Sequence, residues 1–149
     1  MQIEHLRLVI EESELAPWAL RLLEGHEAIS GIRVGLESGA LVFEGRIRIP
    51  FAGEAPFRTV WTVDVDASGC LVVCLTEASA FGRAAGSGFL NAFIMDRIRD
   101  RLVGLAGCVV TGDRVVVEPA ALLAALPVAI HLRVTSVTIE PGRIVLETA

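Results

Sequence analysis

The sequence is missing several residue types that usually narrow a protein's function. Its 149 residues include no lysine and no tyrosine, and asparagine and glutamine occur once each. All 13 basic residues are therefore arginine and, against 18 acidic residues, they leave a net charge of −5. We attribute this bias to a GC-rich genome. Because the basic residues form no run, the sequence predicts neither a nucleic-acid partner nor binding to an anionic membrane surface by charge.

Long uncharged stretches are missing as well. The two longest stretches free of charged residues and histidine, residues 84–95 and 119–130, have 12 residues each, whereas a helix crossing a bilayer needs about 20. Residues 1–12 also lack the apolar core and cleavage site of a signal peptide. The sequence therefore predicts a cytoplasmic protein with no transmembrane segment, folded as a single domain of residues 1–149.

Metal-binding and disulfide patterns are absent too. The cysteines form no CxxC and, being odd in number, predict buried thiols rather than a disulfide framework. The histidines lie in three separate segments without the i, i+4 spacing of a zinc helix. We expect no metal and no cofactor. The residues concerned are Cys70, Cys74, Cys108, His5, His26 and His131.

No catalytic motif can be assembled from the sequence. Residues 86–88 (Gly-Ser-Gly) lack the spacing of a nucleophile elbow. The glycine-rich residues 82–88 contain no lysine for a nucleotide phosphate. We therefore predict a protein that is not an enzyme.

One predicted strand carries two carboxylates, Asp64 and Asp66, on the same face. An acid/base or metal role for this pair would make the protein a hydrolase. We expect instead that Arg46 and Arg48 on the neighbouring strand pair with them.

What the sequence has in abundance is apolar side chains. Hydrophobic residues make up 53% of the chain, and the mean hydropathy is +0.61. This composition excludes intrinsic disorder. It does not explain why a domain of this size has so high a proportion of hydrophobic residues.

Apolar residues alternate with polar ones from residue 32 to residue 77, which predicts an antiparallel meander. Within it, residues 67–69 suit a three-residue turn with Gly69 in the left-handed conformation. A strand over residues 6–10 and a helix over residues 13–25 precede it. The strand at residues 70–76 is apolar on both faces, so we expect it to be covered on both sides or to line something apolar. After a loop at residues 77–88, the spacing predicts a helix over residues 89–105. Its apolar stripe is Leu90, Ile94, Ile98 and Leu102, and its first two turns are apolar all round.

The last third of the chain returns to strands. We expect them at residues 108–111, 114–118, 132–140 and 143–148, with a short helix over residues 119–126. The predicted class is α+β, with a long antiparallel meander, one long helix, a short N-terminal helix and a short C-terminal helix.

The first and last hairpins match at an offset of 103 residues. Five positions are identical, from Val34 with Val137 to Glu44 with Glu147, and they include the turn glycines Gly39 and Gly142. An internal repeat and the chance similarity of two amphipathic hairpins explain this match equally well.

The C-terminal third also resembles a known family. Residues 109–119 (VVTGDRVVVEP), the short Leu/Ala helix ending in Leu-Pro, and the last hairpin are similar to the ending of bacterial tubular lipid-binding (TULIP) proteins. The hairpins at Ser38-Gly39 and Ser68-Gly69 fit the same family's repeated pattern of two strands joined by a glycine turn. The resemblance implies a twisted sheet wrapped around the long helix, with an apolar groove between them for acyl chains.

The resulting hypothesis is a non-enzymatic protein that binds a lipid, or another long fatty-acid-like molecule, between sheet and helix. The alternative is a structural or interaction protein that forms a homodimer through the apolar sheet face of Cys70, Val72 and Cys74. By the resemblance, the ligand contacts would be Phe43, Ile47, Ile49, Trp61, Val63, Phe89, Phe93 and Ile94. The groups expected at the rim are Arg46, Arg48 and Arg83.

Overall fold

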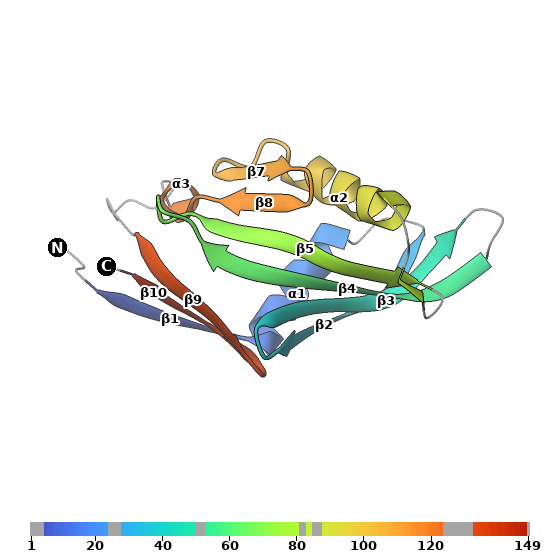
Figure 1. Cartoon of the computed structure of the whole chain (residues 1–149), viewed down its shortest axis with the longest axis horizontal. Helices are drawn as coiled ribbons and strands as arrows, with labels where there is room; N and C mark the ends of the chain where they lie inside the picture. Colours follow the sequence, from blue (N-terminus) through green and yellow to red (C-terminus); the bar gives the residue numbers. More distant parts are fainter. Residues whose placement is uncertain are drawn as a thin grey trace.

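The computed structural model describes residues 5–23, 28–49, 53–80, 83–84, 88–123 and 133–148. Strands dominate these residues, and all the strand pairs are antiparallel (Figure 1). The elements are β1 (Leu6–Glu11), α1 (Glu12–Leu23), β2 (Ile29–Glu37), β3 (Ala40–Ile49), β4 (Gly53–Val65), β5 (Leu71–Ala80), β6 (Arg83–Ala84), α2 (Gly88–Leu102), β7 (Cys108–Thr111), β8 (Arg114–Val117), α3 (Pro119–Leu123), β9 (Val134–Glu140) and β10 (Arg143–Thr148).

The larger sheet has the order β2-β3-β4-β5-β8-β7, with β6 paired to β5. The meander predicted from alternation is therefore confirmed as β2 to β5. The loop predicted over residues 77–88 is wrong in its first part, because β5 continues to Ala80 and pairs there with β6. Residues 78–80 (Ala-Ser-Ala) carry no turn signal, and Ala78 and Ala80 are buried.

Both longer helices cover the same face of this sheet, which we call the inner face. Helix α1 packs against β2, α2 packs against β5 and β7, and the two helices contact each other. The structure therefore does not show the sheet wrapped around one long helix. Helix α2 also ends at Leu102 rather than at residue 105, because the chain turns at Gly104 with a φ of +85°. Its buried residues follow the expected stripe: Leu90, Ile94, Met95, Ile98 and Leu102.

The smaller sheet has the order β1-β10-β9 and adds its apolar face to the same core. It meets the larger sheet at the turns of the two similar hairpins. The Gly39 N–H donates to the carbonyl oxygen of Ile139 at 2.9 Å, and the Gly142 N–H donates to that of Leu36 at 3.1 Å. Gly39 corresponds to Gly142 and Leu36 to Ile139 at the offset of 103 residues. Each hairpin therefore donates to the other from the equivalent glycine to the equivalent carbonyl.

The correspondence extends to a third strand in each unit. Strand β4 pairs with β3 so that Arg58 lies opposite Glu44, and β1 pairs with β10 so that Arg7 lies opposite Glu147. Both pairs are ionic, at 3.5 Å and 4.0 Å. The hairpin match in the sequence thus has a structural counterpart: two three-stranded units whose turns bond each other reciprocally and whose outer strands make equivalent ion pairs.

Candidate functional site

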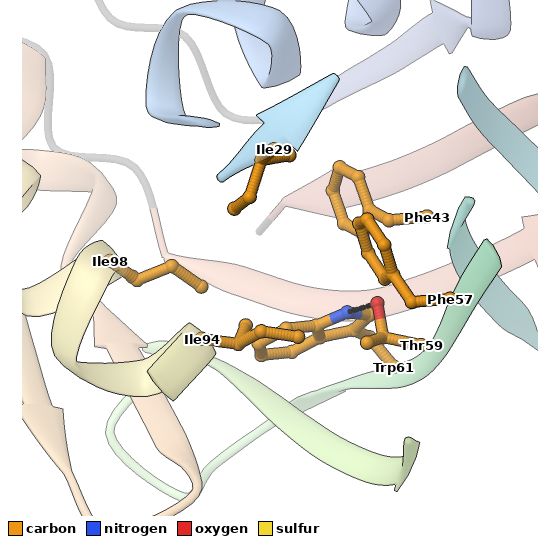
Figure 2. Close-up of a pocket in the computed structure, with 7 residues that line it drawn as sticks. All are labelled: Ile29, Phe43, Phe57, Thr59, Trp61, Ile94 and Ile98. Atoms are coloured by element: carbon orange, nitrogen blue, oxygen red, sulfur yellow. Dashed lines mark hydrogen bonds between the residues drawn. The ribbon is translucent and has the colours of Figure 1, made fainter. Parts of the chain in front are cut away.

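The candidate site is a small apolar pocket between the inner face of the larger sheet and α2 (Figure 2). Its volume is about 20 Å³. One lining residue comes from the start of β2, one from β3, three from β4 and two from α2. They are Ile29, Phe43, Phe57, Thr59, Trp61, Ile94 and Ile98.

Strand register explains why the aromatic residues meet there. Phe43 lies directly opposite Thr59, and Leu41 opposite Trp61, so these side chains share the inner face. The rings of Phe43 and Trp61 pack edge to face, with centroids 6.2 Å apart and planes at 82°. This geometry is the one that aromatic pairs favour. Trp61 is only 2% exposed.

The polar group of this site is satisfied within the site. The indole N–H of Trp61 donates to the hydroxyl oxygen of Thr59 at 2.9 Å, and Thr59 is 1% exposed (Figure 2). The pocket wall itself is apolar. The site can therefore accept a hydrocarbon group, but it offers nothing to hold a charged or strongly polar head group.

Gly45 is part of the same construction. A Cβ atom at this position would lie 2.9 Å from Cε1 of Phe57 and 3.1 Å from the carbonyl oxygen of Ser30. The ring of Phe57, which lies opposite Gly45 in the register, therefore occupies the space that a side chain would take. The absence of a side chain at Gly45 allows Phe57 to form this wall of the pocket.

The structure brings together three of the eight predicted contact residues, since Phe43, Trp61 and Ile94 line the pocket. Ile47 is buried in the same core, and Val63 and Phe93 are partly buried against it. The side chains of the other two, Ile49 and Phe89, lie outside the described part of the structure.

Four lining residues were not predicted. Phe57 and Thr59 alternate with Trp61 along one strand, and Ile98 follows Ile94 by one helical turn. These spacings could have identified all three. Ile29 lies near a β-bulge in β2, between Ser30 and Arg33, which no alternation pattern indicates.

The arginines expected at the rim are placed differently. Alternation puts Arg46 and Arg48 on the face of β3 opposite to the pocket, and both are exposed. Arg46 pairs with Glu54, Nε to Oε1, at 2.7 Å. The side chain of Arg83 lies outside the described part of the structure.

The expected pairing of these arginines with Asp64 and Asp66 is wrong. In the register, Arg46 lies opposite Pro56 and Arg48 opposite Glu54, whereas Asp64 lies opposite Val72 on the other side of β4. Asp66 instead stabilises the turn between β4 and β5. One of its oxygens, Oδ1, accepts hydrogen bonds from the Ser68 hydroxyl at 2.7 Å and the backbone N–H of Ser68 at 2.9 Å. It also accepts one from the N–H of Cys70 at 3.0 Å.

These bonds lower the pKa of Asp66 from its ordinary 3.8, and the Ser68 hydroxyl contributes most. A carboxyl whose pKa is lower in the folded protein stabilises it when ionised, and that contribution is lost as the pH falls through the folded-state pKa. We expect Asp66→Asn to lower the melting temperature at neutral pH. The difference from the unmodified protein should shrink well below pH 3.8. A difference that does not change with pH would contradict this role.

The described part of the chain contains no group of three or more His, Cys, Asp or Glu side chains arranged to hold a metal ion. None of its helices is long and apolar enough to span a membrane. Comparison of the chain with protein-family models, with curated proteins and with solved structures gives no match.

Proposed function

We propose that this protein binds a fatty-acid-like or other apolar ligand without chemical turnover, and that the hydrocarbon end of the ligand enters the pocket of Trp61, Ile94 and Ile98. The observation that carries the proposal is an apolar wall whose buried polar pair is already satisfied, between the indole of Trp61 and the hydroxyl of Thr59. The resemblance to tubular lipid-binding proteins points to the same class of ligand.

The size of the pocket limits what binds without movement. A cavity of about 20 Å³ has room for one small group, since a single water needs at least ~10–15 Å³ on this measure. Each buried methylene contributes about 0.8 kcal/mol, so one such group gives weak binding. A longer chain has to widen the pocket by moving Ile94 and Ile98 on α2 away from β4.

Trp61 provides a direct readout of ligand entry. The chain has two tryptophans, so a Trp18→Phe variant reports through Trp61 alone. We expect saturated fatty acids to shift its emission, with an affinity that rises with chain length because each added methylene contributes to burial. Native mass spectrometry of the purified protein should show the same molecules bound. An emission unchanged by every chain length, in a protein isolated free of ligand, would refute the proposal.

A matched pair of variants separates binding from stability. Ile98→Phe places a larger side chain in the pocket, whereas Leu102→Phe makes a similar change one turn later on α2, at a buried residue that does not line it. Overpacking costs about 1–3 kcal/mol at either position. We expect only Ile98→Phe to abolish the response of Trp61.

A further inference from the structure

The outer face of the larger sheet, opposite to α1 and α2, has two unlike halves. On β2, β3 and β4 it carries charged side chains joined in ion pairs. Arg58 bonds Glu37 at 3.1 Å and Glu44 at 3.5 Å, and Arg46 bonds Glu54 at 2.7 Å. This is the usual composition of a sheet face that meets water.

The other half, on the end of β4 and on β5, β8 and β7, carries valine and cysteine side chains in its centre, with Thr62, Asp64, Thr111 and Arg114 beside them. The register places Val72 beside Val116 and Val116 beside Val109 in one row, and Cys74 in the next row. Val109 is 60% exposed, while the others are half-buried and lie outside the main core. We call this surface the outer apolar patch: Cys70, Val72, Cys74, Val109 and Val116.

Two charged residues flank β5 on this patch. Asp64 lies beside Val72 on the β4 side, and Arg114 lies beside Cys74 on the β8 side. Both are exposed, and neither makes an ion pair or a side-chain hydrogen bond with any residue in the described ranges. The patch thus has one unpaired negative and one unpaired positive group, on opposite sides of a central strand.

We propose that a second copy of this chain covers the outer apolar patch, with Asp64 of each copy paired to Arg114 of the other. A two-fold axis that lies in the interface and runs parallel to β5, over Val72 and Cys74, stacks the β5 of one copy on the β5 of the other and exchanges its two neighbours. It therefore brings the β4 of one copy over the β8 of the other. Face-to-face sheets pack about 10 Å apart with strands crossing at about 30°, a gap that an arginine side chain can span.

The arrangement of charges favours a second copy over another occupant. One two-fold contact makes the pair between Asp64 and Arg114 twice, once in each direction, and buries the apolar residues between the two pairs, as an isologous interface requires. A lipid chain would leave Asp64 and Arg114 unpaired. The protein's net charge of −5 also disfavours an anionic membrane surface.

Charge exchange tests the pairing. By sedimentation equilibrium at micromolar concentrations, we expect a dimer for the unmodified protein. Asp64→Arg and Arg114→Asp should each weaken it at least about tenfold by placing like charges opposite each other. The double variant should restore it. Arg48→Asp, on the charged half of the same face, is the control and should change nothing. A monomer at all concentrations, or a dimer that neither single variant weakens, would overturn the proposal.

Cross-linking tests the position of the axis. Cys74 lies near it, so a variant retaining only this cysteine should be joined efficiently by a short bis-maleimide. Cα atoms about 10 Å apart exceed the reach of a disulfide. A matched variant retaining only Cys108 should react poorly, because this residue packs against the core and burial raises the pKa of its thiol. Equal cross-linking of the two variants would contradict this geometry.

Because the patch and the pocket lie on opposite faces, the two proposals can fail separately. A monomeric protein whose Trp61 still responds to fatty acids would reject only the dimer.

Discussion

Replacement of Trp61 by alanine should lower the free energy of unfolding by about 3–5 kcal/mol, as truncation of a buried aromatic residue does. The side chain is 2% exposed, packs against the ring of Phe43, and donates the hydrogen bond that satisfies Thr59. Its loss leaves a cavity in contact with the existing pocket. Urea unfolding followed by circular dichroism measures the change.

Two milder variants divide this effect into its parts. Trp61→Phe keeps most of the ring volume and removes the N–H, so it should lower the free energy of unfolding clearly less than Trp61→Ala does. Thr59→Val keeps the shape and leaves the indole N–H without an acceptor, which costs about 1–3 kcal/mol. A loss below ~1 kcal/mol for Trp61→Ala would show that the inner face is not packed around this residue as described.

Substitution of Gly45 by alanine should destabilise the protein by about 1–3 kcal/mol, the usual cost of overpacking, and should also change the pocket. The new methyl group would lie 2.9 Å from one ring carbon of Phe57 and 3.1 Å from the backbone oxygen of Ser30. The ring is the softer of the two neighbours and is expected to shift. Since Phe57 lines the pocket, the response of Trp61 to fatty acids should fall as well.

Gly35 provides the matched control for this prediction. It lies in β2 of the same sheet, and a Cβ atom there would meet nothing within 4 Å. Gly35→Ala should therefore be neutral or slightly stabilising. Phe57→Leu should relieve much of the strain of Gly45→Ala, so the two changes should combine non-additively. Equal effects at Gly35 and Gly45 would contradict the explanation.

The two proposals assign different tasks to the two faces of one sheet. The inner face holds the pocket under α2, and the outer face carries the patch for a second copy. Strand β5 has apolar side chains on both faces: Leu75 is buried in the core beside Trp61, while Val72 and Cys74 point the other way. The two proposals together would explain why this strand is apolar on both faces: the core covers one face, and the second copy would cover the other.

The sequence by itself determined the local elements. Alternation predicted β2 to β5, helical spacing predicted the buried stripe of α2, and the turn at residues 67–69 placed Gly69 in the left-handed conformation seen at a φ of +84°. These features follow from periodicity and turn chemistry, which act over a few residues.

Only the tertiary structure decided which elements face each other. Register placed Arg46 opposite Pro56 rather than beside Asp64, and so left Asp64 without its expected partner. The packing of α2 over β4 brought Ile98 to Thr59 and Trp61, which line a small pocket together with four other residues. Strand pairing and helix packing join residues far apart in the chain, and their geometry depends on the whole core rather than on any local pattern.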